Sequence, residues 1–207
     1  MPKVILLEPR REAARAAAPL NERPDDDLML LARTGSKAAF AALAQRYVGR
    51  LTSFCAKQIG DIAAAEDIVQ ETWIRIWAHR VSYRPQEKFL VLLYTTARNL
   101  CRNHGRGARR RERWLPSVAA PADLERVVDE RPDHVEALIA RELEGDVHRA
   151  LGELPEPMRE ALLLRFSESL AYEDIAAIVG ASESTVRSRV FHGLKRLHGH
   201  LTEWRRS

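Results

Sequence analysis

The sequence predicts an all-α fold of two helical domains joined by an acidic linker, the C-terminal domain being a helix-turn-helix. Apolar residues recur every three or four positions, which is the spacing of one helix face. No stretch alternates apolar and polar residues as a half-buried strand does. Between residues 114 and 133 prolines and acidic residues replace the helical pattern, and this change predicts a linker.

Composition divides the chain into four segments. Residues 1–24 are rich in Arg, Ala and Pro and are predicted to form a disordered tail. Residues 25–113 form the first domain, 114–133 the linker and 134–207 the second domain. From 123 to 146 nine acidic residues stand against three arginines, so the end of the linker and the start of the second domain are acidic.

Capping residues locate the helices of the first domain. Asp25–Asp27 can cap a helix that runs into four apolar residues, and Ser36 can cap the next helix after a Gly-Ser break. Asp61 opens a third helix. The stretch 83–86 is predicted to be a loop, and the long helix that follows, 89–111, is apolar first and then strongly basic.

The second domain has the residue pattern of a helix-turn-helix. Pro155 starts a helix that is expected to continue to Leu170. A short helix follows over 172–179, and a longer one over 183–198. Gly180 occupies the tight turn between these two helices, as the motif requires.

The last two helices divide their residues between a core and an outer face. The residues predicted to pack between them are Ile175, Ala176, Val179, Val186, Val190 and Leu194. The residues predicted to face DNA, with Ser182 also as the N-cap, are Ser182, Ser184, Thr185, Arg187, Ser188, Arg189 and His192. Arginine can bind guanine with two hydrogen bonds, and Ser and Thr reach bases or phosphates. The alternative is an ordinary helical hairpin with a solvated charged face.

A second basic segment follows the apolar half of the long helix. Its arginines, opposed only by Glu112, are Arg102, Arg106, Arg109, Arg110, Arg111 and Arg113. On a helix they would form a stripe for a polyanion, and the nearby Asn99 and Asn103 can hydrogen-bond base edges. The alternative is a solvated tail, or a phosphate contact without sequence specificity.

Aromatic residues offer a further route to nucleic acid. Tyr83 is predicted to lie in a loop beside Arg80 and Arg84, where its ring can stack on a base. Trp73 and Trp77 lie on an apolar helix face and are predicted to be core residues.

The helix that Asp61 opens carries a partner-binding candidate. Its polar face holds Asp67, Gln70 and Glu71, with Ile74 on the same side. An exposed Ile beside acidic residues suggests a contact with another protein. The alternative is a solvated helix face, because single exposed apolar residues are common.

Composition excludes several classes of protein. Lys and Arg total 33 against 29 Asp and Glu, a net charge of +4 that weakly favours an acidic partner. Two cysteines are too few for a disulfide framework or a four-ligand zinc site. No apolar run approaches the ~20 residues of a membrane helix. No catalytic, phosphate-loop or metal-ligand motif is present. The sequence therefore predicts a soluble cytoplasmic protein that is not an enzyme and needs no metal or cofactor.

Five stretches together resemble a known family. Residues 65–73 resemble the polymerase-binding helix of bacterial sigma factors, and 94–99 with the arginines after them resemble the helix that binds the promoter −10 element. Residues 154–166, 170–176 and 185–189 resemble the domain that reads the −35 element. The short two-domain layout is similar to that of the extracytoplasmic-function (ECF) group.

The resemblance implies a specificity subunit of RNA polymerase, with three sets of contacts. The polymerase-binding residues it implies are Asp67, Gln70, Glu71 and Ile74. Those for the melted −10 strand are Arg80, Tyr83, Arg84, Lys88, Asn99, Arg102, Asn103, Arg106, Arg109 and Arg110. The outer residues of the last helix would read the −35 element. Core RNA polymerase, promoter DNA and an anti-sigma factor are the implied partners.

Two other functions fit the same residues. One is a stand-alone regulator that binds an operator as a dimer through its helix-turn-helix and has no need of the Gln70 and Ile74 surface. The other is a protein-interaction adaptor, against which the basic face of the last helix argues.

Overall fold

A computed structural model of the chain describes residues 18–85, 88–112 and 145–204, and for 106–112 and 202–204 it describes the backbone only. The described part contains helices and no strand, which confirms the all-α prediction. Residues 145–153 are helical as well. The labelled elements are η1 (Leu20–Glu22), α2 (Asp25–Arg33), α3 (Lys37–Ile59), α4 (Ile62–His79), η2 (Arg80–Ser82), α5 (Phe89–Glu112), α7 (Glu156–Leu162), η4 (Leu163–Ser167), α8 (Tyr172–Val179) and α9 (Glu183–Trp204).

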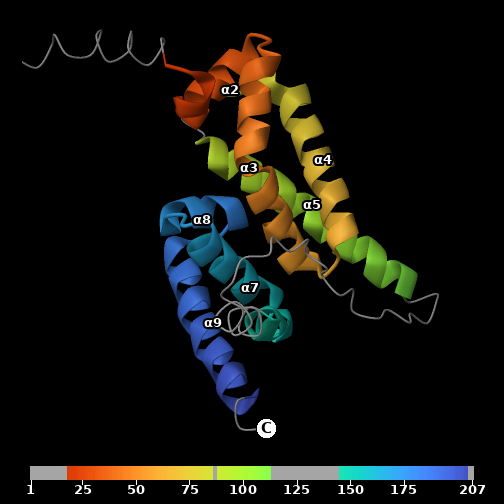
Figure 1. Cartoon of the computed structure of the whole chain (residues 1–207). Coiled ribbons are helices and arrows are strands. Elements are labelled where there is room, and N and C mark those ends of the chain that lie inside the picture. The colour runs from red at the N-terminus through yellow and green to blue at the C-terminus, as the bar shows by residue number, and fades with distance from the viewer. Residues whose placement is uncertain (1–17, 86–87, 113–144, 205–207) are drawn as a thin grey trace, which may run out of the picture.

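The N-terminal unit, α2 to α5, is built around three long helices. α3, α4 and α5 pack on one another, and α2 packs across one end of α3 (Figure 1). Trp73 is 9% exposed and meets Phe40 edge-on at 5.5 Å between ring centroids. Trp77 is partly buried against the same core. The prediction that both tryptophans serve the core is confirmed.

Side-chain caps begin two of the three helices for which the sequence predicted them. The predicted cap at Asp25–Asp27 is wrong, because α2 begins directly after Pro24 and no side chain caps it. The Ser36 hydroxyl accepts a hydrogen bond from the Ala39 amide at 3.2 Å at the start of α3. The Asp61 carboxylate accepts one from the Ala64 amide at 3.1 Å at the start of α4. Each cap satisfies an amide that has no partner within its helix.

The helix that Pro155 starts is shorter than predicted. α7 ends at Leu162, and η4 then makes a single π-helical turn. Ser169 has a φ of 57°, a left-handed backbone that no helix continues through. Leu170 therefore lies in the turn before α8 rather than in the helix, although its side chain is buried.

The inward face of α9 differs at one position from the prediction. Val186 and Val190 are buried as expected, but Leu194 is 42% exposed and Gly193 is buried in its place. A Cβ atom on Gly193 would lie 3.1 Å from Leu162 Cδ1, so α9 approaches α7 closely there. α8 spans only eight residues, and α9 extends beyond it to pack on α7.

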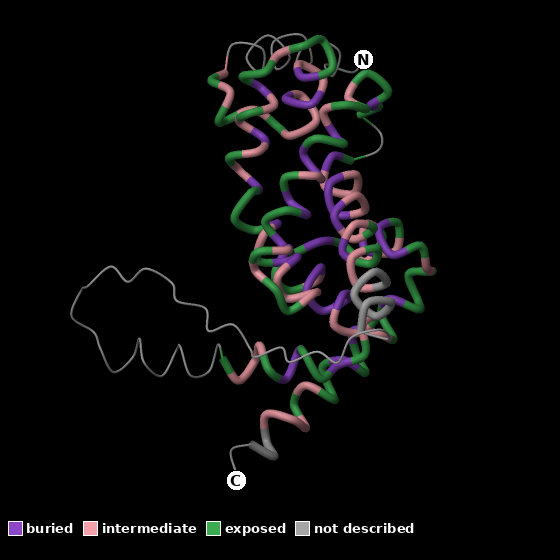
Figure 2. Tube along the Cα trace, turned by 90° about the vertical axis from the view of Figure 1, so that its right-hand side faces the viewer, coloured by how far each residue is buried: buried purple, intermediate pink, exposed green. Residues whose placement is uncertain are grey.

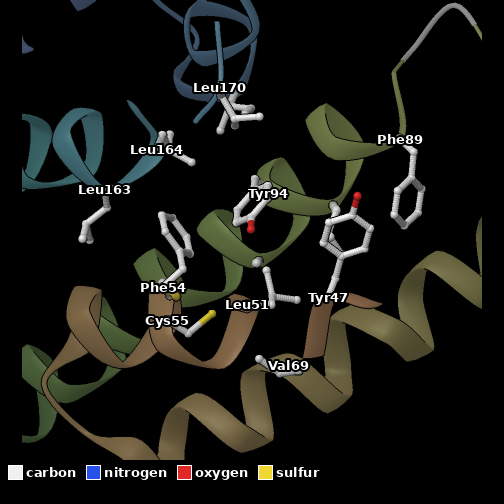
Figure 3. Packing of buried hydrophobic residues seen from close by; sticks show 14 of the residues in the cluster. Tyr47, Leu51, Phe54, Cys55, Val69, Phe89, Tyr94, Leu163, Leu164 and Leu170 are labelled. Carbon is white, nitrogen blue, oxygen red and sulfur yellow. The ribbon is translucent and has the colours of Figure 1, made fainter. Parts of the chain in front are cut away.

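The C-terminal unit, residues 145–204, packs directly on the N-terminal unit. Its Leu163, Leu164 and Leu170 side chains belong to the same apolar cluster as Phe54 and Tyr94 (Figure 3). α8 contacts α5 and α7 contacts α3. Buried and exposed stretches alternate along the described helices of both units (Figure 2).

Order begins before residue 25, so the predicted boundary of the tail is wrong. η1 packs on α3, where the Arg46 guanidinium donates to the carbonyls of Asn21 at 2.9 Å and Arg23 at 3.1 Å. Residues 1–17 and the predicted linker 114–133 lie outside the described residues.

Two glycine substitutions should change stability in opposite directions. Gly180 has a φ of 65° at the end of α8, so Gly180→Ala should lower the free energy of unfolding by about 1 kcal/mol. Gly49 lies exposed inside α3 with open space around it, so Gly49→Ala should raise stability by about 1 kcal/mol. Urea denaturation of both variants checks the signs, and equal effects would contradict this account of the turn.

Candidate nucleic-acid and partner-binding surfaces

The N-terminus of α9 is organised by Ser182. Its hydroxyl accepts from the Thr185 amide at 3.2 Å and lies 2.7 Å from the Thr185 hydroxyl and 3.0 Å from the Ser184 hydroxyl. The predicted N-cap is therefore confirmed. The same three hydroxyl groups gather at the positive end of the helix dipole, a position that favours phosphate.

The outer face of α9 exposes most of the predicted DNA-facing residues. Ser184, Arg187, Ser188 and His192 are exposed, whereas Arg189 is half-buried at the side of the helix. Ser184, Ser188 and His192 project away from buried Val186 and Val190, which occupy the opposite face of the helix, whereas Arg187 lies at its side.

Arg187 is held on the side of α9 that adjoins α8. Its Nε donates to the Glu183 carboxylate at 3.0 Å, and its guanidinium lies 4.2 Å from the centroid of the Tyr172 ring. Arg165 approaches the same ring at 4.9 Å. The Arg187 side chain nevertheless remains 59% exposed, so it can meet a ligand without leaving these contacts.

The outward face of α4 presents three exposed residues and one half-buried one. Asp67, Gln70 and Ile74 are exposed, Ile74 to 54%. Glu71 is half-buried and accepts from Arg75 Nε at 2.6 Å, one turn further along α4. We call Asp67, Gln70, Glu71 and Ile74 the α4 patch.

The loop before α5 contradicts the interpretation of Tyr83 as a stacking residue. Its side chain is 2% exposed, and its hydroxyl donates to the Asp26 carboxylate in α2. The same carboxylate oxygen accepts from the Phe89 amide at 3.0 Å. Tyr83 is therefore an anchor of the loop, because its ring cannot reach a base without leaving the core.

The basic residues around this loop differ in how far their side chains are exposed. Arg80 is half-buried: it donates to the Trp77 carbonyl at 2.8 Å and stacks on the Trp77 ring at 4.0 Å. Arg84 and Lys88 are exposed. Lys88 reaches the Asp174 carboxylate of α8 at 2.6 Å, which raises the pKa of its ammonium group.

The outer face of α5 carries the other predicted contacts. Asn99, Arg102 and Asn103 are exposed. The side chains of Arg106, Arg109 and Arg110 lie outside the described residues, although the helix backbone continues through them. Within the described residues no cluster of His, Cys, Asp and Glu could hold a metal ion.

Two family models match the chain. The model described as "Sigma-70 region 2" matches residues 43–111, and the one described as "Sigma-70, region 4" matches 137–197. The RNA polymerase sigma-H factor of Pseudomonas aeruginosa is 30% identical over 175 residues, covering 83% of this chain and 91% of that protein. The sigma factor CarQ of Myxococcus xanthus is 30% identical over 171 residues, covering 83% and 94%.

The chain is a member of the sigma-70 family, in its ECF group. As such it binds core RNA polymerase and directs promoter-specific initiation of transcription.

Solved structures share the sigma factor's fold. The structure of CnrH in complex with the cytosolic domain of CnrY has a TM-score of 0.65 at 21% identity, covering 86% of this chain and 97% of that one. RpoE of Bartonella quintana, solved with the anti-sigma factor NepR, has a TM-score of 0.55 at 26% identity, covering 77% and 96%. None of the described helices of the sigma factor combines the length and apolar character needed to span a membrane.

Phe191 and Val81 are exposed apolar residues near the predicted binding surfaces, but the sequence analysis did not include them among the site residues. Phe191 is 65% exposed on the outer face of α9, with its ring 5.3 Å from that of His192. Val81 is 68% exposed just beyond the end of α4. The available signal was spacing, since Phe191 lies one turn after Arg187 and Ser188.

Removing the Asp26 carboxylate should loosen the loop before α5. Asp26→Ala should lower the free energy of unfolding by about 2 kcal/mol, because the Tyr83 hydroxyl and the Phe89 amide both lose their acceptor. Tyr83→Phe removes one of these two bonds and should cost about 1 kcal/mol. Thermal denaturation compares the two, and a larger loss in Tyr83→Phe would contradict the central role of Asp26.

Proposed function

We propose that the sigma factor binds core polymerase through the α4 patch and reads its promoter with two separate surfaces, α5 for the −10 element and α9 for the −35 element. The observation that carries this assignment is that α4 and α9 both leave hydrogen-bonding and apolar side chains exposed on the faces that point away from the core. Such residues contribute little to the fold, so their arrangement favours a role in binding.

The α4 patch suits a protein partner. Ile74 offers an apolar centre, and Asp67 and Gln70 surround it with polar groups. Interfaces commonly combine an apolar core with a polar rim. The exposed Val81 beyond the end of α4 would extend the apolar part of this surface.

Gln70→Ala combined with Ile74→Glu should abolish binding to core polymerase and leave the fold intact. A carboxylate placed at an apolar contact costs several kcal/mol at an interface hot spot. A pull-down with core polymerase measures the loss, and circular dichroism checks the fold. Unchanged capture of polymerase would show that the α4 patch is not the docking surface.

The −10 assignment includes α5 and the exposed part of the loop before it. Asn99 and Asn103 can hydrogen-bond unpaired bases, and Arg102 can neutralise a phosphate. Arg84 and Lys88 supply charge at the start of α5. Capture of unstacked bases offsets the few kcal/mol that melting costs. The residues proposed to continue this stripe are Arg106, Arg109 and Arg110.

The −35 assignment includes the outer face of α9. Arg187 can bind guanine with two hydrogen bonds, and Ser184 and Ser188 can reach phosphate or base edges. Phe191 adds an apolar group suited to a thymine methyl. Ser182, Thr185, Arg189 and His192 complete the set at the cap and the sides of the helix.

Arg187→Ala should relax specificity at one position of the −35 element, where a bidentate contact supplies ~1–3 kcal/mol of discrimination. Arg110→Ala should weaken all promoters alike and reduce the salt slope of binding by about 1, as expected for a phosphate contact. Transcription from templates with substituted −35 bases, at two salt concentrations, compares the variants. A base-selective loss in Arg110→Ala would reverse the two roles.

The three proposed surfaces also assign a function to each segment of the chain. Residues 25–113 would carry polymerase and −10 binding, 134–207 the −35 contacts, and 114–133 the connection between them. The polymerase performs the chemistry, and the sigma factor acts in the cytoplasm, where polymerase and chromosome are. Since RpoE of Bartonella quintana was solved with an anti-sigma factor, we include such a protein among the partners.

Reconstitution with purified core polymerase tests the proposal as a whole. The sigma factor should support transcription from a subset of templates whose −10 and −35 positions are randomised, and core polymerase alone should not. Tight specific binding to DNA without polymerase would favour the stand-alone regulator.

A further inference from the structure

The guanidinium group of Arg187 is held by two neighbouring side chains. The central carbon of the guanidinium lies 4.2 Å from the ring centroid of Tyr172, the first residue of α8. The Glu183 carboxylate, one turn earlier in α9, accepts from Nε at 3.0 Å and also from Nη2. The ring covers a face of the planar guanidinium and the carboxylate covers an edge, so together they fix the plane of the group and its direction.

These contacts leave the end of the guanidinium without a partner among the described residues. The group has five N–H donors, and the Glu183 carboxylate takes that of Nε and one of the two on Nη2. The donors of Nη1 and the second donor of Nη2 lie at the tip of the side chain. Two parallel donors of this kind match the O6 and N7 acceptors of guanine. The Arg187 side chain is 59% exposed, so a base edge can reach them.

The Tyr172 ring is itself fixed by the core and by a second arginine. The ring is half-buried and packs against the apolar core. The Arg165 guanidinium lies 4.9 Å from the ring centroid, and Arg165 Nη1 donates to the Leu170 carbonyl at 2.9 Å in the turn before α8. An exposed ion pair alone would hold Arg187 weakly. The half-buried ring therefore supplies the rigid part of the arrangement.

A fixed Arg187 loses less conformational freedom when it binds. Ordering a long side chain at an interface lowers affinity by about two- to tenfold. This loss arises only where the arginine makes its contact, which is at the preferred base. An arginine that already has its bound orientation avoids most of the loss. Preorganisation therefore widens the difference in affinity between the preferred base and the others.

We propose that Tyr172 is a positioning residue for recognition of the −35 element, because its ring holds Arg187 with the Nη1 and Nη2 donors directed at a guanine. The inference rests on the proposed role of Arg187 in reading that element. Tyr172 acts through Arg187, so its contribution depends on the aromatic ring and requires no contact between its hydroxyl and DNA. The first helix of the helix-turn-helix thereby contributes to specificity through a side chain of the second.

The test removes the ring within the full chain, assembled with core polymerase. The variants are Tyr172→Leu, Tyr172→Phe, Arg187→Ala, and Tyr172→Leu combined with Arg187→Ala. Leu197→Ala is the matched control, because Leu197 is a partly buried core residue of α9 about three turns beyond Arg187. Transcription is measured from a promoter that the wild-type chain uses and from templates with each −35 base pair substituted in turn. Thermal denaturation checks the fold of each variant.

Tyr172→Leu should lower the ratio of transcription from preferred and substituted templates about threefold, at the one position that Arg187→Ala also relaxes. Tyr172→Phe should retain the ratio, because it keeps the ring. In the Arg187→Ala background, Tyr172→Leu should change the ratio no further. Leu197→Ala should lower transcription from all templates alike, as expected for a loss of packing alone.

A purely structural role for Tyr172 would give a different result. A loss in Tyr172→Leu that is uniform across the −35 positions, or that persists in the Arg187→Ala background, would overturn the proposal. An equal loss in Tyr172→Phe would also overturn it, since the hydroxyl would then be the group that acts. Base preference lost in Arg187→Ala but kept in Tyr172→Leu would overturn the positioning role alone. Unchanged base preference in Arg187→Ala would instead overturn the proposed −35 role of Arg187, and the positioning role with it.

Discussion

The buried carboxylate of Glu168 joins the two halves of this molecule. It lies inside the apolar contact between the units, where Tyr94 donates to it and Arg50 supplies a positive charge. Removal of a carboxylate from water is costly unless its lone pairs and its charge are satisfied. The partners come from α5 and α3, so a buried Glu168 carboxylate is satisfied only when the C-terminal unit is docked on both helices. The contact between the two units is therefore specific in its polar partners as well as apolar in its packing.

α5 has one apolar side and one basic side. One side packs into the N-terminal core through residues such as Leu93 and Ala97, both fully buried. The other side presents Arg98 and Arg102 to acidic residues of α7. A surface that binds phosphate also binds carboxylate, because both ligands are anionic acceptors of hydrogen bonds.

Each unit exposes a large apolar residue on a binding surface that we propose. Ile74 on α4 and Phe191 on α9 lie opposite faces that are already buried. Neither contributes to the described core, and each lies among polar side chains that can hydrogen-bond. The proposed partner of Ile74 is a protein, and that of Phe191 is a base edge.

The sequence by itself determined the elements that depend on short-range chemistry. Ser36, Asp61 and Ser182 cap helices because each side chain reaches an amide three residues later. The all-α class followed in the same way, because the spacing of apolar residues is a local property. The family likewise followed from motifs that stand contiguous in the sequence.

Only the tertiary structure decided which of these residues remain available. Tyr83 looked like an exposed loop residue, but it is buried, and its hydroxyl donates a hydrogen bond to Asp26, 57 positions earlier in the chain. Leu194 looked like a core residue, but α8 is too short to cover it. The ion pairs between the two units join residues that are 54 to 86 positions apart in the chain, Arg102 with Glu156 and Lys88 with Asp174 among them. Spacing within a helix carries no information about such pairs, because they exist only where separate helices meet.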